Sequence, residues 1–338
     1  MKALVYRRYG GPDELELADV PQPQPRQHEV LVRVYAASVN AADRVLLRGK
    51  PLLIRLAMGF PRPRRPTLGF DVAGRVEAVG SGVTEFRTGE DVFGASNFGA
   101  FAEFVCVDQE TLVSKPVDVS FEEAAATPTA GYTALQGLRK GGIEAGQKVL
   151  IDGASGGVGT FAIQIARAYG AEVTAVCSTK NLEIARSLGV SRVIDYRHED
   201  FAREGERYDL VLAANAFRPL SDYRRVLKPD GAYVLTGGGG AQILQAMLLG
   251  ALVSMTSSRR MGNIMAVAKK NDIVALREML DTGKIKPVID RTVALSDVPE
   301  AIRYLEEEHA RGKVVVNVRP HPGQSIDELK NRAGVLRT

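Results

Sequence analysis

Short apolar runs alternate with helical patterns through the middle of the chain. The strand-like runs are rich in Val, Ile, Leu and Ala and cover residues 148–151, 172–177, 193–196, 208–213 and 232–236. Helical segments lie between them, including residues 161–166, 182–189 and 221–227. Strands that alternate with helices over about 100 residues predict an α/β fold with a doubly wound parallel sheet, whose ligand lies at the carboxyl ends of the strands.

The two ends of the chain follow a different pattern. From residue 1 to about residue 120, short β-like runs are interrupted by Gly and Pro, with alternation at 30–34, 72–79 and 101–107. This pattern predicts an irregular, barrel-like β domain. Near the other end, residues 296–307 form a helical pattern and residues 313–318 a strand, and the polar stretch from residue 320 is expected to be extended or poorly ordered.

The apolar run at 148–151 leads into a glycine-rich turn and then into a helix, which together make a candidate phosphate site. Free N–H groups and the positive dipole end at a helix start favour a pyrophosphate. Ala154 stands where the usual G-x-G-x-x-G pattern has its first glycine, so the strand before and the helix after carry the prediction. An ordinary glycine-rich loop is the alternative. The candidate cofactor residues of this turn are Ser155, Gly156, Gly157, Val158 and Gly159.

The end of the second strand indicates which nicotinamide cofactor binds. NAD sites usually place an Asp or Glu there to bond the ribose 2′-hydroxyl. This chain has Ser178, Thr179 and Lys180 instead, and hydroxyls with an ammonium would hold a 2′-phosphate. We therefore predict NADP. The alternative, that Ser178 caps the next helix and Lys180 is a solvated lysine, is compatible with it.

Composition limits which kinds of partner and which cellular compartment we expect for the protein. The chain of 338 residues has 45% hydrophobic and 25% charged residues, a net charge of +4 and a pI near 9.0. Arg62, Arg64 and Arg65 cluster between prolines with no aromatic residue interleaved, so we expect a solvated loop and no nucleic acid partner. No apolar stretch reaches the length of a membrane span, and we expect no membrane partner. Two cysteines and a start without a signal-peptide core predict a cytoplasmic protein.

Several motifs in order make the chain similar to one family. The motifs are ASVNAAD (37–43), LGFDVAG (68–74), GAFAEF (99–104), AGYTA (130–134), VIDY (193–196) and GKVV (312–315). With the glycine turn, they resemble the medium-chain dehydrogenase/reductase superfamily, in particular its zinc-free quinone oxidoreductase-like branch. The resemblance implies a Rossmann domain (123–270) inserted into a GroES-like β-barrel catalytic domain (1–122 and 271–338), with the cofactor in the cleft between them.

The same resemblance implies roles for individual residues. Asn40 would lie in the active-site cleft and Thr133 near the nicotinamide, each able to donate a hydrogen bond. Tyr132 could donate a proton, although a packed aromatic is the simpler interpretation, and Asn40 could be only a turn residue. Asp43 is expected to cap the following helix segment. Lys180 and Tyr196 match positions near the 2′-phosphate, and the further cofactor-binding candidates are Gly237 and Lys313.

Departures from the zinc enzymes of the superfamily shape the predicted chemistry. Zinc-dependent alcohol dehydrogenases have a Cys where this chain has Asn40, and a His-Glu pair where it has Phe70 and Asp71. Their structural zinc needs four nearby cysteines, and only Cys106 lies between residues 80 and 131. We therefore expect no metal. A metal-free site suits NADPH-dependent hydride transfer to a quinone or an α,β-unsaturated carbonyl, since the conjugated carbonyl is itself the electron sink.

Other functions stay open. The chain could be an enoyl-thioester reductase, although residues 44–67 lack the tyrosine acid those enzymes tend to carry. It could be a zinc-free alcohol dehydrogenase-like protein, a zinc alcohol dehydrogenase with unrecognised ligands, or a catalytically silent NADP(H)-binding redox sensor. A small-molecule substrate is expected in the enzymatic cases. The family's habit of pairing sheets edge to edge predicts a homodimer, with residues 251–256 as the last strand.

Overall fold

The structure is a computed structural model that describes the chain except residues 239–241, 243–244, 246–257, 308–309 and 321–338. The chain divides into two compact units. Unit 1 comprises Met1–Thr129, Ala268–Asp281 and Ile289–Thr338, and unit 2 comprises Ala130–Val267 and Thr282–Val288.

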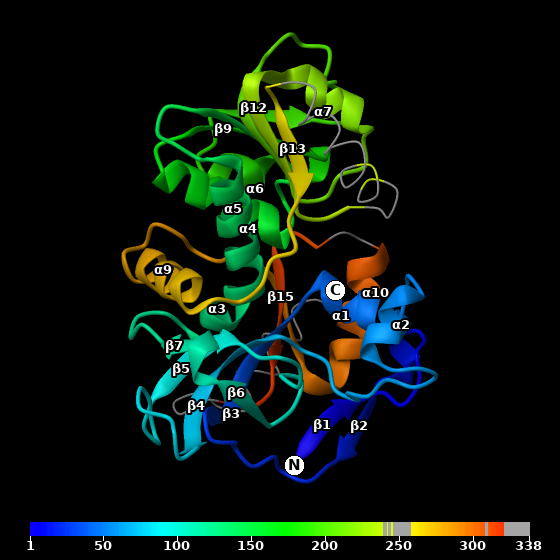
Figure 1. The fold of residues 1–338 in the computed structure, drawn as a ribbon, viewed down its shortest axis with the longest axis vertical. Helices are drawn as coiled ribbons and strands as arrows, with labels where there is room; N and C mark the ends of the chain where they lie inside the picture. The colour runs from blue at the N-terminus through cyan, green and yellow to red at the C-terminus, as the bar shows by residue number, and fades with distance from the viewer. Residues whose placement is uncertain (239–241, 243–244, 246–257, 308–309, 321–338) are drawn as a thin grey trace. The chain divides into compact units, whose positions relative to one another are not determined.

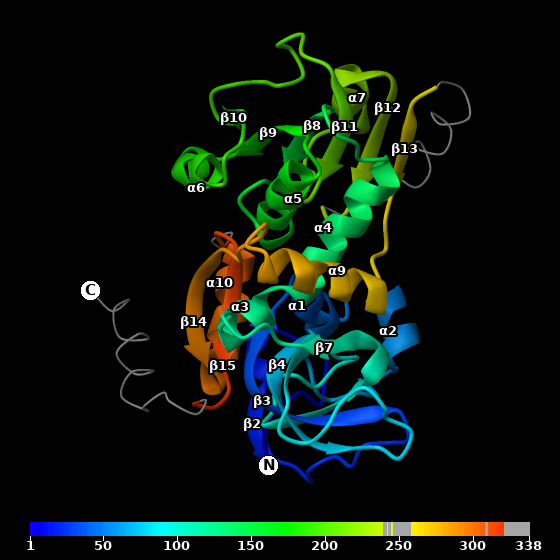
Figure 2. The ribbon, with the colours of Figure 1, turned by 90° about the vertical axis from the view of Figure 1, so that its left-hand side faces the viewer.

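Unit 2 contains the parallel sheet that the sequence predicts. Its strands are β8 (Lys148–Asp152), β9 (Glu172–Cys177), β10 (Arg192–Asp195), β11 (Tyr208–Ala213), β12 (Leu227–Leu235) and β13 (Arg260–Asn263). They lie in the order β10-β9-β8-β11-β12-β13, which can be followed across unit 2 in Figure 2, and every pair is parallel. The strand order reverses between β8 and β11, which is where such sheets bind their ligands. The predicted doubly wound fold is confirmed.

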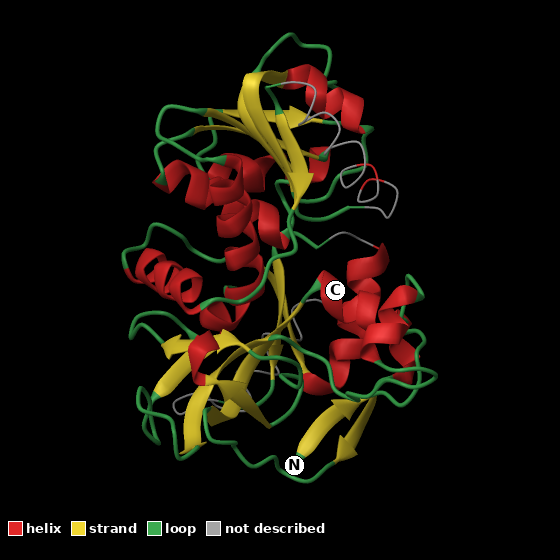
Figure 3. Cartoon of the chain, in the orientation of Figure 1, coloured by secondary structure: helices red, strands yellow, loops and turns green. Residues whose placement is uncertain are grey.

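Helices accompany this sheet in unit 2 (Figure 3). They are α5 (Gly157–Ala168), α6 (Leu182–Ser187) after a 3-10 turn (Thr179–Asn181), α7 (Leu220–Val226), and α4 (Pro128–Gly141) from Ala130 onward. The α5 side chains Phe161, Ile163 and Ile165 are fully buried. Tyr223 of α7 packs between Phe201 and Tyr233 of β12. Its ring centroid lies 5.8 Å from that of Phe201 and 4.8 Å from that of Tyr233. Burial of these apolar side chains holds the helices on the sheet.

Unit 1 is the β-rich part formed by both ends of the chain. Its strands are β1 (Lys2–Val5), β2 (Glu16–Asp19), β3 (Glu29–Val39), β4 (Asp71–Val79), β5 (Asp91–Ala95), β6 (Phe104–Asp108), β7 (Leu112–Ser114), β14 (Ile289–Ala294) and β15 (Lys313–Asn317). The long strand β3 pairs with β4, β6 and β15, and all three pairings are antiparallel. The strand β15 comes from the far end of the sequence, so the two chain ends close one sheet (Figure 1).

Five helices and three 3-10 turns complete the described part of unit 1. They are α1 (Ala41–Arg48), α2 (Leu53–Met58), α3 (Phe121–Ala126), α9 (Lys270–Asp281) and α10 (Val298–Glu307), with 3-10 turns at Pro12–Glu14, Gln109–Thr111 and Leu295–Asp297. The helix α1 follows directly from β3 and ends at Gly49, whose φ of 56° favours glycine. It packs on α10, where Arg48 forms a bidentate ion pair with Glu306 at 2.5 Å.

The division of the chain differs slightly from the boundaries expected at residues 123 and 271. Residues 123–129 belong to unit 1 because α3 packs on β3 and β4. Residues 282–288 belong to unit 2, where the Gln164 side chain both donates to Lys286 O and accepts from Lys286 N–H. The expected strand at 251–256 lies outside the described residues, and in the described sheet β13 is the edge strand next to β12. Among the described residues, no helix is long and apolar enough to cross a membrane.

Candidate active site

The glycine turn joins β8 to α5 in unit 2. Gly153 has φ +78°, and a Cβ on Gly159 would lie 2.2 Å from Gly153 O, so the turn and the helix approach too closely for any side chain there. At Gly156, by contrast, the nearest atom to an added Cβ is 3.6 Å away. Gly156 is also the N-cap of α5 and has no side-chain capping bond, which leaves the first N–H groups of the helix to an anion.

The loop after β9 lies beside this turn. Asn181, which the sequence analysis missed, donates from Nδ2 to the hydroxyls of Ser155 (2.8 Å) and Ser178 (3.2 Å). The structure thus brings together two residues predicted separately as cofactor ligands. Asparagine after a strand is an ordinary turn residue, so no local signal points to this contact.

A carboxylate that the sequence analysis also missed lies next to the same loop. Asp195, at the end of β10, accepts the Thr179 hydroxyl at 2.5 Å and the Arg197 N–H at 3.0 Å. The hydrogen bond from Thr179 is the main reason that the pKa of Asp195 lies below its usual value. The next residue, Tyr196, is 51% exposed and its N–H bonds Cys177 O.

The remaining unit 2 candidates lie on other elements. Gly237 follows β12, and a Cβ there would lie 2.5 Å from Ala214 O, so close chain packing already requires glycine. Tyr132 and Thr133 lie on α4, and Tyr132 is 9% exposed, as a packed aromatic would be. Lys180 lies in the 3-10 turn after Ser178.

Asn40 belongs to unit 1, where it is the N-cap residue of α1 at the end of β3. Its side chain is engaged on every side by the protein. Nδ2 donates to Ser38 O (3.2 Å) and to Asp71 Oδ2 (3.0 Å), while Oδ1 accepts from Lys313 Nζ at 2.6 Å. The amide therefore links a buried carboxylate to a buried ammonium.

Asp71 and Lys313 are the charged pair of this cluster. The Lys313 side chain is 3% exposed, the Asp71 side chain 0%, and their charged atoms lie 3.3 Å apart. Asp71 also accepts from the Ser38 hydroxyl (2.6 Å) and from both the N–H (2.8 Å) and hydroxyl (2.6 Å) of Thr129. Lys313, predicted as a cofactor ligand, directs its ammonium at Asn40, Asp71 and Val39 O in this structure.

Asp43 is a second buried carboxyl of the same region. Its oxygens accept the N–H groups of Asn40 (2.8 Å) and Gly69 (2.9 Å), so it fixes the start of α1 as expected. Burial is the largest influence on its pKa and raises it to about 7, against the lowering effect of the two N–H bonds and of Lys313.

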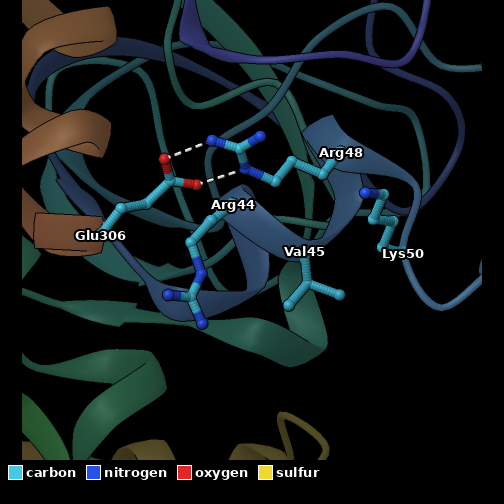
Figure 4. Close-up of a pocket in the computed structure, with 5 residues that line it drawn as sticks. All are labelled: Arg44, Val45, Arg48, Lys50 and Glu306. Carbon is cyan, nitrogen blue, oxygen red and sulfur yellow. Dashed lines mark hydrogen bonds and ion pairs between the residues drawn. The ribbon is translucent and has the colours of Figure 1, made fainter.

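A surface hollow of about 310 Å³ lies further along α1 (Figure 4). It is lined by Arg44, Val45, Arg48, Lys50 and Glu306, and the ion pair between Arg48 and Glu306 crosses it. None of the predicted site residues lines this hollow.

Comparisons with known proteins agree with this geometry. Residues 26–117 match the family model described as "Alcohol dehydrogenase GroES-like domain", and residues 188–316 match "Zinc-binding dehydrogenase". The chain is 35% identical to the NADPH-dependent alkenal/one oxidoreductase of Arabidopsis thaliana, over 94% of this chain and 79% of that protein. The chain therefore belongs to the quinone oxidoreductase-like branch of the medium-chain dehydrogenase/reductase superfamily.

Solved structures of medium-chain dehydrogenase/reductase proteins match the same span. The quinone oxidoreductase from Coxiella burnetii has a TM-score of 0.84 and 30% identity, covering 94% of this chain and 99% of that one. The CurK enoyl reductase has a TM-score of 0.84 and 28% identity, covering 94% and 99%. The predicted family and the combination of Rossmann and GroES-like parts are confirmed.

One family model of this medium-chain dehydrogenase/reductase is named for zinc, so the fit of the residues to that ion matters. Of the three positions compared with the zinc enzymes, Phe70 has no metal-binding atom, and Asn40 and Asp71 bond each other and the ammonium of Lys313. The side-chain oxygens of Asn40 and Asp71 thus already accept hydrogen bonds from the Lys313 ammonium. Among the described residues, no group of three or more His, Cys, Asp or Glu side chains is arranged to hold a metal ion. This donor set does not fit a tetrahedral zinc site.

Proposed function

We propose that this protein is an NADPH-dependent oxidoreductase that reduces a quinone or an α,β-unsaturated carbonyl without a metal ion. The observation that carries the proposal is the Asn40–Asp71–Lys313 cluster, in which the Lys313 ammonium bonds oxygens at two of the three positions that were compared with the zinc enzymes. The relative from Arabidopsis thaliana is named for NADPH and for alkenal/one substrates, which supports the same cofactor and acceptor class.

Binding of the cofactor is assigned to unit 2. The N–H groups at the start of α5 suit the pyrophosphate, and the Ser178 hydroxyl and the Lys180 ammonium suit the 2′-phosphate. When bound, NADPH supplies the hydride. The chain's own residues bind it, orient the acceptor and exclude water.

Stabilisation of the acceptor is assigned to unit 1. Hydride addition to a conjugated carbonyl develops negative charge on the carbonyl oxygen. A hydrogen-bond donor directed at that oxygen stabilises the transition state, and a nearby positive charge strengthens the effect. Asn40 meets this need if one amide hydrogen exchanges its longer bond, 3.2 Å to Ser38 O, for the acceptor oxygen. Lys313 then keeps the amide polarised from the other side. Thr133 is retained as the candidate that orients the nicotinamide end.

The test is a steady-state assay on the purified protein that follows loss of NADPH absorbance. A simple quinone and a simple enone should both be reduced, and secondary alcohols with NADP⁺ should be poor substrates because the proposed site has no Lewis-acid metal to stabilise an alkoxide. Asn40→Ala should lower kcat by roughly tenfold to a hundredfold, and affect NADPH binding much less. A fully active Asn40→Ala variant, or efficient alcohol oxidation, would contradict the proposal.

A second candidate, reduction of an enoyl thioester, is favoured by the match to the CurK enoyl reductase structure. A short enoyl thioester used far better than the matching free enone would select it. Binding of NADP(H) without turnover of any of these acceptors would instead select the redox-sensor function. The homodimer and the cytoplasmic location remain predictions, and light scattering at micromolar concentration tests the first.

A further inference from the structure

Asn181 lies where the two loops assigned to the cofactor meet. The residue is 3% exposed, and its N–H bonds Ser178 O at 2.8 Å, which closes the 3-10 turn after β9. Its Nδ2 then reaches Ser178 Oγ in the same loop and Ser155 Oγ in the turn after β8. One buried amide therefore connects the proposed pyrophosphate turn to the proposed 2′-phosphate loop.

The two bonds from Asn181 limit the directions in which the Ser155 and Ser178 hydroxyls can donate. A serine hydroxyl carries one hydrogen and accepts through its oxygen, so an oxygen that accepts from Asn181 must direct its own hydrogen elsewhere. Within the part of the chain that the structure describes, no protein acceptor takes the hydrogen of Ser155 or Ser178. Both hydroxyls can therefore donate to an anionic ligand.

The oxygen of the same Asn181 amide also bears on ligand binding. Asn181 Oδ1 is buried and has no hydrogen-bond partner among the described residues. Buried polar atoms are normally paired, and an unpaired one in a candidate binding site indicates a group that a ligand supplies. A carbonyl oxygen can only accept, so the ligand group must be a donor such as a sugar hydroxyl.

We propose that Asn181 is the residue that makes this chain select NADPH over NADH. Its Nδ2 holds the Ser178 hydroxyl as a donor toward the 2′-phosphate, which NADH lacks, and the Ser155 hydroxyl as a donor toward the pyrophosphate. Its Oδ1 accepts the 3′-hydroxyl of the adenosine ribose, a contact that both cofactors can make. This inference rests on the proposed use of NADPH. A carboxylate at position 181 would supply the acid typical of NAD sites and would repel a 2′-phosphate. The nearby Asp195 already has Thr179 and Arg197 as partners.

Substitutions at position 181 separate this role from a general effect on the fold. Asn181→Asp changes one atom type and adds a negative charge, and Asn181→Ala removes the amide. Asn271→Asp, on the exposed start of α9 in unit 1, adds the same charge as a matched control. Calorimetric Kd values for adenosine 2′,5′-bisphosphate and adenosine 5′-monophosphate isolate the 2′-phosphate, and KM values for NADPH and NADH follow on the full protein.

The expected results differ in kind between the variants. Asn181→Asp should weaken the bisphosphate about tenfold or more and leave the monophosphate unchanged or tighter, since one like-charge contact acts on one ligand only. Asn181→Ala should weaken the bisphosphate several-fold and the monophosphate less, because only the bisphosphate carries the 2′-phosphate assigned to Ser178. Asn271→Asp should match the wild type.

Three outcomes would overturn the inference. Equal weakening of both nucleotides by Asn181→Asp would mean a structural role only, and wild-type affinities in both variants would mean no contact. Should Asn181→Asp fail to fold, Asn181→Ser takes its place, and unchanged discrimination between the nucleotides in that variant also refutes the inference. A wild-type protein that neither prefers the bisphosphate nor oxidises NADPH would instead refute the proposed function itself.

Discussion

Replacement of Lys313 by methionine tests whether the buried cation is needed to balance Asp71. Methionine keeps the length and apolar stem of the side chain and removes the charge. Breaking a buried ion pair by removing one partner costs about 3–5 kcal/mol, because the remaining charge is left uncompensated. Asp71 keeps four other donors, from Ser38, Asn40 and both groups of Thr129, so the low end of that range applies. We expect Lys313→Met to lower the free energy of unfolding by about 3 kcal/mol.

Urea unfolding at pH 7.5, followed by circular dichroism, measures this loss. Lys2→Met is the control, because Lys2 pairs with Asp19 at 2.7 Å while their side chains are 51% and 75% exposed. An exposed pair contributes at most about 1 kcal/mol. Adding Asp71→Asn to Lys313→Met removes the stranded charge and should restore part of the stability. A loss no larger than that of Lys2→Met, or a double variant no more stable than Lys313→Met, would refute the reasoning.

Three further predictions concern the cofactor, the metal and pH. Lys180→Ala should raise the KM for NADPH about tenfold and leave that for NADH nearly unchanged, by analogy with other charge-assisted contacts; equal losses would defeat the assignment. Chelators should change neither activity nor Tm, and metal analysis that finds one tightly bound zinc per chain would contradict this. Burial raises the pKa of Asp152, which accepts the Tyr223 hydroxyl at 2.5 Å, from 3.8 to about 6. The folded state therefore retains a proton that the unfolded state has lost, and this carboxyl's contribution to stability falls as pH rises between these values. Relative to wild type, Asp152→Asn should gain up to about 3 kcal/mol between pH 4 and pH 7, measured by urea unfolding; a pH-independent difference would count against the shift.

The strands of unit 2 could be predicted from the sequence because each is a short apolar run with turn residues on both sides. The runs at 172–177 and 208–213 coincide with β9 and β11, since both strands are buried on two faces and leave little choice of pattern. The glycine turn could also be predicted from the sequence, because the backbone of residue 153 lies too close to position 159 for any residue other than glycine.

The polar partners at the site could not be predicted in the same way. Lys313 bonds Asn40 across 273 sequence positions, and no local pattern reports such a contact. Asn181 bonds Ser155 across 26 positions and looks like any turn asparagine in the sequence. The edge strand β13 was also missed, because Arg260–Asn263 contains only one large apolar residue, Met261.

The pairing of β15 with β3 has a consequence for the order in which the protein is made. Val314 pairs with Val39, so β3 cannot complete this pairing until a segment far later in the sequence has been synthesised. Unit 2 needs nothing beyond residue 288 and can fold while synthesis continues. Until residues 313–317 are available, β3 has an open edge over residues 36–39 and Asp71 has no ammonium beside it. A nascent or truncated chain that ends before β15 is therefore the form most exposed to strand-to-strand aggregation and proteolysis.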